Sequence, residues 1–138
     1  MTGTCDGTAD DDVWYSFVAS ATTHTITVVG GANFDAVISL RSGACPGTLV
    51  GTCVDATGSA GTETITATTL TVGQTYYVRV YEYYANGSSS GAPGPFTICV
   101  TSPADLIVSA GNSPYSASGT FNNVTIQSGG TANLSADL

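Results

Sequence analysis

Short runs of residues that alternate between two faces recur along this chain, and they constrain its fold more than any other feature. At 95–100, for example, Phe96, Ile98 and Val100 share one face. Because successive side chains of a β-strand point to opposite faces, this period of two predicts strands. Comparable runs, rich in β-branched and aromatic residues, lie at 12–18, 24–29, 36–41, 48–54, 62–67 and 74–84. No window shows a helical period of 3.6, so we expect an all-β protein of sandwich or barrel type.

The charge balance excludes two classes of partner. The chain carries ten acidic residues against two basic ones, Arg41 and Arg79, for a net charge of −8. Such a chain cannot make the phosphate contacts on which nucleic-acid affinity depends, and it repels anionic lipid surfaces. Its apolar stretches are far shorter than the roughly 20 residues that span a bilayer. We therefore expect no nucleic-acid partner and no membrane insertion.

The four cysteines, Cys5, Cys45, Cys53 and Cys99, lack the paired spacing of a zinc site. An even number in a chain of this kind predicts two disulfides and an oxidising, extracellular setting. Three pairings are possible. The short loop between Cys45 and Cys53, and the position of Cys5 and Cys99 near the two ends of the strand pattern, favour the pairs Cys45–Cys53 and Cys5–Cys99.

A domain boundary is expected near Ser102 and Pro103, because proline removes a ladder donor and the composition changes after it. This predicts a first domain at 1–102 and an extension at 103–138. The extension has weak strand patterns at 106–109, 122–127 and 131–136. It has few large apolar residues and cannot bury enough surface to fold alone. We expect the first domain, a neighbouring chain or a continuation of the protein to hold it.

Five segments in a fixed order resemble a known family. They are DVWYSF (12–17), NFDAV (33–37), SGAC (42–45) with CVD (53–55), LTVGQTYYVRV (70–80) and FTICV (96–100). Together they are similar to the β-sandwich modules related to bacterial pre-peptidase C-terminal domains, particularly those in large secreted and cell-surface proteins of Bacteroidetes-type bacteria. The resemblance covers roughly residues 5–101. It implies a jelly-roll-like antiparallel β-sandwich that is non-catalytic and is attached to secreted proteases, glycosidases and adhesins.

The chain departs from this pattern at its start, where only four residues precede Cys5. Modules of this family usually have further strand material there. A sandwich without that strand has an exposed edge, which favours completion by another strand. The extension at 103–138 can supply it within the chain, or in a neighbouring copy as a donor strand of a fibre. The segment GTFNNVTI at 119–126 also resembles the first rungs of repetitive β-rich stalks.

Carboxylates are the candidate metal ligands. Asp10, Asp11 and Asp12 are consecutive, and Ca2+ is bound by loops that offer several carboxylates and carbonyls at once. The alternative is a solvated acidic loop. Asp35 and Asp55 flank strands at positions that match motifs of the resembled family, which makes them further candidate Ca2+ ligands. As the commoner alternative, each accepts hydrogen bonds from loop amides.

The strand at 74–84 carries a candidate ligand-binding stripe. If the strand alternates strictly, Tyr77, Arg79, Tyr81 and Tyr83 share one face, and the opposite face, with its two valines, should be the core. Three tyrosines and an arginine then point outward, an arrangement on which sugar rings stack. A neighbouring strand, loop or subunit covers such a face equally well.

No catalytic system is recognisable. The chain has one histidine, His24, and no Gly-x-Ser-x-Gly turn, and its only glutamates, Glu63 and Glu82, sit in no known motif. We therefore expect a non-catalytic extracellular structural or adhesive module that assembles into a surface fibre through strand pairing by its extension. Its expected partners are other copies of itself or adjacent domains. The alternative is a carbohydrate-binding accessory module with polysaccharide as its partner.

Overall fold

The computed structural model describes residues 6–85, 94–108 and 121–126 of the chain. Within them it contains only strands, turns and loops, and no helix. The chain separates into two compact units, Met1–Thr101 and Ser102–Leu138. The described part of the first unit contains seven strands, which are β1 (Val13–Val18), β2 (His24–Gly30), β3 (Ala36–Ser42), β4 (Thr48–Val54), β5 (Thr62–Ala67), β6 (Thr75–Glu82) and β7 (Phe96–Thr101).

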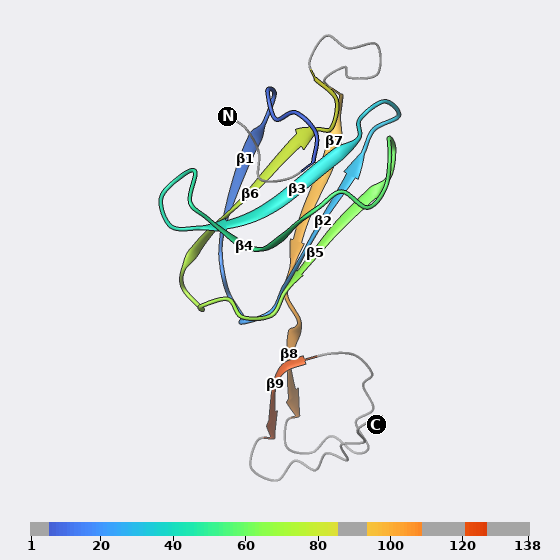
Figure 1. Cartoon of the computed structure of the whole chain (residues 1–138). Helices are drawn as coiled ribbons and strands as arrows, with labels where there is room; N and C mark the ends of the chain where they lie inside the picture. The colour runs from blue at the N-terminus through green and yellow to red at the C-terminus, as the bar shows by residue number, and fades with distance from the viewer. Residues whose placement is uncertain (1–5, 86–93, 109–120, 127–138) are drawn as a thin grey trace. The chain divides into compact units, whose positions relative to one another are not determined.

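The seven strands form two antiparallel sheets that pack face to face (Figure 1). One sheet has four strands in the order β1-β6-β3-β4, and the other has three in the order β5-β2-β7. The β-sandwich expected from the sequence is therefore confirmed. The second sheet therefore has one strand fewer than the first.

The core is built from the inward-facing positions of the central strands. Ile26 and Val28 of β2 meet residues of the opposite sheet, and each of these side chains is fully buried. The opposing set comprises Ile38 and Leu40 of β3 with Val78 and Val80 of β6. Burial of each large aliphatic side chain contributes about 1.5–3 kcal/mol, so this layer supplies most of the driving force for folding.

Strand β3 departs from alternation because it is buried on both faces. Val37 and Ser39 point away from the core, yet both are fully inaccessible to solvent. A strand with one solvated face would expose these positions. The outer face of the four-stranded sheet is therefore covered, in part by the segment that precedes β1.

The strands expected in the first unit are all present, with small differences in their bounds. The largest difference is in β6, which ends at Glu82 rather than at residue 84. Beyond that point the backbone of Tyr83 leaves the ladder, and its amide donates to Asp35 O at 2.9 Å while its carbonyl accepts from Thr8 N at 3.0 Å. Hydrogen bonds to two loops thus replace strand pairing.

The second unit contains two described strands, β8 (Ala104–Val108) and β9 (Phe121–Ile126), which pair in parallel. They correspond to the strands expected at 106–109 and 122–127, with shifted bounds. The third expected strand, at 131–136, lies outside the described residues. A parallel pair needs a crossover of a dozen or so residues, and residues 109–120 connect these two strands in the sequence.

Candidate functional site

The stripe expected on β6 is not an exposed platform. The core side is as predicted, because Tyr76, Val78 and Val80 are buried between the sheets. On the other face, however, the exposed fractions of Arg79 and Tyr81 are 2% and 1%. Of the two alternatives for this face, the covered one therefore holds for Arg79 and Tyr81, and only Tyr77 and Tyr83 keep partial exposure.

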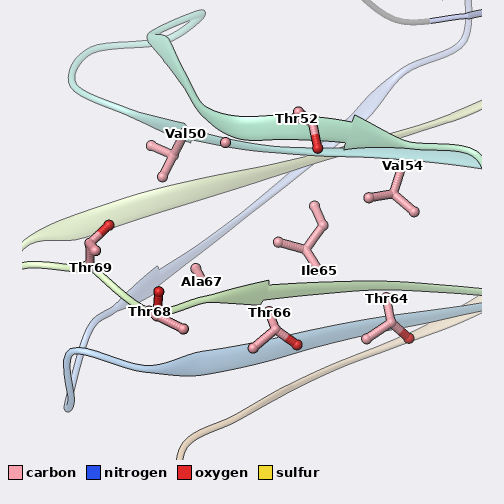
Figure 2. Close-up of a pocket in the computed structure, with 10 residues that line it drawn as sticks. Val50, Thr52, Val54, Thr64, Ile65, Thr66, Ala67, Thr68 and Thr69 are labelled. Carbon is pink, nitrogen blue, oxygen red and sulfur yellow. The ribbon is translucent and has the colours of Figure 1, made fainter.

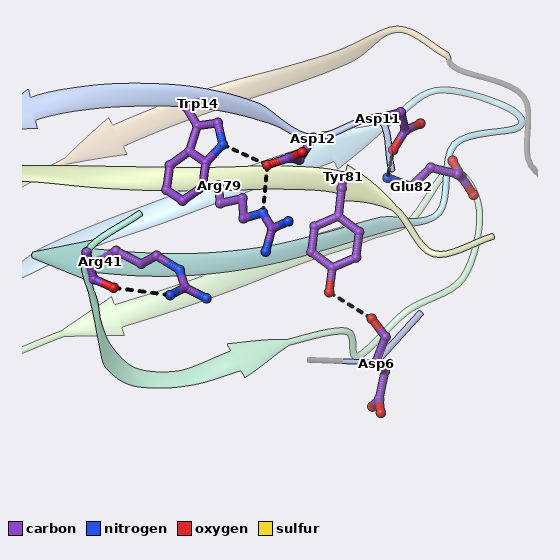
Figure 3. Close-up of polar contacts among 9 residues, drawn as sticks. Asp6, Asp11, Asp12, Trp14, Arg41, Arg79, Tyr81 and Glu82 are labelled. Atoms are coloured by element: carbon purple, nitrogen blue, oxygen red, sulfur yellow. Dashed lines mark hydrogen bonds and ion pairs between the residues drawn. The ribbon is translucent and has the colours of Figure 1, made fainter. Parts of the chain in front are cut away.

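The acidic segment before β1 covers this face. Asp12 Oδ2 accepts hydrogen bonds from Arg79 Nε at 2.9 Å and from the Trp14 indole nitrogen at 2.7 Å (Figure 3). The guanidinium lies over the rings of Trp14 and Tyr81, with its carbon 5.5 and 5.1 Å from their centroids. Burial, the largest effect, acts to raise the pKa of Asp12, but the bonds from Trp14 and Arg79 outweigh it and lower the pKa overall.

Residues that precede Asp12 in the same segment contact Tyr81 and Tyr83. The Tyr81 hydroxyl donates to Asp6 O at 2.7 Å (Figure 3), and Ala9 packs against Tyr81 beside Val37. Gly7 has a φ of +74°, and a Cβ at this position would lie 2.5 Å from Tyr83 O. Only glycine allows so close an approach together with this backbone conformation. Several contacts spread along β6 therefore hold the segment.

The five candidate metal ligands do not converge on one point. Asp12 is engaged by Arg79 and Trp14, and Asp11 Oδ1 accepts from Glu82 N at 3.3 Å. Asp10 also has a partner. Asp35 and Asp55 lie instead with two glutamates at one end of the sandwich. Among the described residues no three His, Cys, Asp or Glu side chains are placed to hold one metal ion.

That end of the sandwich is a concentration of carboxylates, which we call the acidic end and define as Asp11, Asp35, Asp55, Glu63 and Glu82. Burial raises the pKa values of Asp35, Asp55 and Glu82. Nearby negative charges raise them further, from Glu63 on Asp35, from Asp35 on Asp55, and from Asp35 and Asp11 on Glu82. No arginine contributes to these three shifts, so the acidic end has no counter-charge among the groups that act on it.

The two glutamates differ in whether both of their carboxylate oxygens accept hydrogen bonds. Glu63 accepts from Ala56 N and Thr57 N at 2.7 Å and from the Thr57 hydroxyl at 2.5 Å, which fixes the turn after Asp55. The Glu82 carboxylate accepts main-chain hydrogen bonds from Asp35, whose N lies 2.9 Å from Oε2, and from Tyr84, but Oε1 has no partner. Sequence reasoning named both residues only as the chain's two glutamates and assigned them no site. The usable signal was alternation, which places Glu82 on the same face as Val78 and Val80.

The expected disulfide pairs are corrected by the structure. Cys45 and Cys99 are exposed free thiols, so neither Cys45–Cys53 nor Cys5–Cys99 forms. Cys5 lies outside the described residues. Cys45 lies in the turn of the β3–β4 hairpin, whereas Cys53 is five residues beyond Thr48, where the hairpin closes on Ser42. Five strand residues span roughly 17 Å, far beyond the ~7 Å limit between the Cα atoms of a disulfide.

One lateral edge of the sandwich is open, where β1 and β7 face each other. Their inward residues meet across the gap, since Tyr15 and Phe96 make an edge-to-face contact with ring centroids 6.0 Å apart. Yet the exposed fractions of Val13 and Tyr15 are 41% and 42%, although their ladder partners on β6 are the buried core valines. Among the described residues β7 pairs only with β2, and β1 pairs only with β6. Within the described residues, β7 therefore has a free ladder edge on the side of β1.

A pocket of about 350 Å³ lies on the opposite lateral side, between β4 and β5. Figure 2 shows Val50, Thr52 and Val54 on one side of Ile65, and the threonine side chains of β5 on the other. None of its lining residues carries an ionisable group, so it offers hydroxyl and methyl groups alone to a ligand.

No family model, curated protein or solved structure matches this chain. Within the described residues there is also no helix able to cross a membrane.

Proposed function

We propose that this protein is a non-catalytic extracellular structural or adhesive module that assembles into a fibre, each copy receiving a strand at its β1/β7 edge. The observation that carries this proposal is the open edge itself. Three of the six exposed large hydrophobic residues of the described chain, Val13, Tyr15 and Val18, belong to β1. Neither β1 nor β7 contains a charged residue or a proline, the usual guards of an exposed edge.

The proposed occupant is the C-terminal unit of a neighbouring copy. Its two described strands, of five and six residues, form a parallel pair, and an isolated two-stranded sheet is marginally stable at best in water. Strand β7 has six residues, so the lengths match. Between them, β8 and β9 carry a single charge, on Asp105. The β8/β9 pair of one copy can therefore add to the β7 edge of another copy by strand addition.

The location of the protein and its family-like character are part of the same proposal. The extracellular setting and the jelly-roll-like, pre-peptidase C-terminal-like character rest on the resemblance of the five sequence segments. The carbohydrate-binding alternative needs a flat aromatic face, and the burial of Arg79 and Tyr81 removes half of the proposed stripe. The structural function is therefore the one that the geometry favours.

The test is a matched pair of edge variants in the full chain. Thr97→Lys together with Thr101→Lys places two lysines on exposed positions of β7, which should block strand addition. Thr64→Lys together with Thr66→Lys does the same on β5, the other edge of the same sheet. Light scattering after size exclusion should show concentration-dependent assembly of the wild type and of the β5 variant, and a monomeric β7 variant.

Two results would overturn the proposal. A wild type that stays monomeric up to millimolar concentration has no assembly to explain. Equal loss of assembly in the β5 and β7 variants would show that added charge alone, rather than the β7 edge, controls association.

A further inference from the structure

Two carboxylate oxygens at the acidic end are buried without a hydrogen-bond partner. They are Asp35 Oδ1 and Glu82 Oε1, in residues whose exposed fractions are 7% and 1%. A buried acceptor without a donor carries a desolvation penalty, which is larger for a charged group. Glu63, equally buried on the neighbouring sheet, shows the satisfied alternative with three donors.

The backbone holds the two residues together. Asp35 N donates to Glu82 Oε2 at 2.9 Å, and Asp35 O accepts from Tyr83 N at 2.9 Å. Ala36, the residue after Asp35, is the register partner of Glu82 in the β3–β6 ladder. The Glu82 carboxylate therefore lies against the backbone of Asp35, in a position fixed by the ladder and by loop hydrogen bonds on either side of it.

In the described part of the chain, no cationic group is among those that act on this pair. Arg79 is used by Asp12, and Arg41 donates to Gly47 O in the β3–β4 turn, at the opposite end of β3. The sequence contains no lysine. The other charged groups that act on the pair, Asp11 beside the Glu82 amide (Figure 3) and Glu63, are negative. Asp55 adds a further negative charge close to Asp35.

We propose that a divalent cation with a preference for oxygen ligands, Ca2+, binds at the acidic end through Asp35 Oδ1 and Glu82 Oε1. Ca2+ accepts six to eight oxygens in flexible geometry, so the two carboxylates would supply part of its ligands, and main-chain carbonyls and water the rest. Mg2+ requires near-ideal octahedral geometry and fits such a site less well. This site differs from the Asp10–Asp12 cluster and stands independently of the strand-addition function.

The experiment compares the thermal midpoint of the full chain in excess chelator and in Ca2+. At 100 times its dissociation constant, Ca2+ should raise the midpoint by roughly 10 °C. Glu82→Gln and Asp35→Asn should each abolish that rise. In chelator, these two variants should also melt above the wild type, because each removes one repelling buried charge. Sensitised Tb3+ luminescence of the wild type, displaced by Ca2+, gives a second readout that does not depend on the variants folding.

Asp12→Asn is the matched control, because it removes an acidic charge that is already paired with Arg79. It should retain the full Ca2+ response. Equal midpoints in chelator and in Ca2+, with no Tb3+ signal, would overturn the proposal. So would an unchanged Ca2+ response in both Glu82→Gln and Asp35→Asn, or a response lost only in the Asp12 variant.

Discussion

At the scale of single residues, the buried Arg79 guanidinium explains why an acidic segment lies over a sheet. Its exposed fraction is 2%, and its only ion pair among the described residues is with Asp12. Trp14 and Tyr81 lie against the guanidinium, where cation–π attraction adds to the ion pair. The first role of these acidic and aromatic side chains is therefore to join the segment before β1 to β6.

Asp12→Asn should lower the free energy of unfolding by about 2 kcal/mol, because it leaves a buried arginine without its counter-charge. The partial exposure of Asp12 keeps the loss below that of a fully buried pair. Adding Arg79→Met should restore part of the loss, which a double-mutant cycle in urea would measure. Asp6→Asn is the control, since the Tyr81 hydroxyl bonds the main-chain oxygen of Asp6. Additive losses in the cycle would show that Asp12 and Arg79 do not interact.

The raised pKa values of Asp35, Asp55 and Glu82 predict an unusual pH dependence for the metal-free protein. A carboxyl whose folded pKa is raised is destabilising when ionised, and this penalty disappears as pH falls through the folded pKa. The lowered pKa of Asp12 acts oppositely, giving stability above the ordinary value of 3.8 that is lost as pH falls below it.

In chelator, the midpoint should therefore rise as the pH is lowered through these raised pKa values toward the ordinary carboxyl values of 3.8 and 4.5, and should fall at lower pH. Glu82→Gln should flatten the rise. Calorimetry between about pH 8 and pH 3 would measure these midpoints. A midpoint that decreases steadily from about pH 8 downward would show that repulsion among the carboxylates of the acidic end does not destabilise the fold.

At the scale of the elements, alternation predicted the strands well because it is a local property of the chain. It also placed Tyr81 and Arg79 correctly on the face opposite Val78. It could not show that this face is covered, because the covering segment lies far away in sequence and carries no period of its own. The cysteine pairs failed for a related reason, since a short loop in sequence becomes a long separation once β3 and β4 form a hairpin.

Removal of residues 103–138 tests the second unit. If these residues supply the added strand, the shortened chain should lose assembly, and its thermal midpoint should no longer depend on protein concentration. Scanning calorimetry at two concentrations, compared with the full chain, would measure this. Persistent concentration dependence in the shortened chain would place the contact within the sandwich itself.

At the scale of the whole molecule, a net charge of −8 opposes any association of identical copies. The β1/β7 edge is uncharged, so contact there must overcome only the long-range repulsion. Assembly should accordingly strengthen when NaCl is raised from 20 to 500 mM, because the Debye length falls from about 20 Å to about 4 Å. Sedimentation velocity would show this, and weaker assembly in high salt would instead indicate intermolecular ion pairs.

Hydrogen exchange at the two edges of the three-stranded sheet tests strand addition most directly. Strands β5 and β7 occupy opposite edges, and both pair only with β2 in the described chain. As protein concentration rises, the amides of residues 96–101 should become protected while those of residues 62–67 keep their exchange rates. Protection that is unchanged in β7, or that increases equally in both strands, would contradict the proposal that the β1/β7 edge receives a strand from a neighbouring copy.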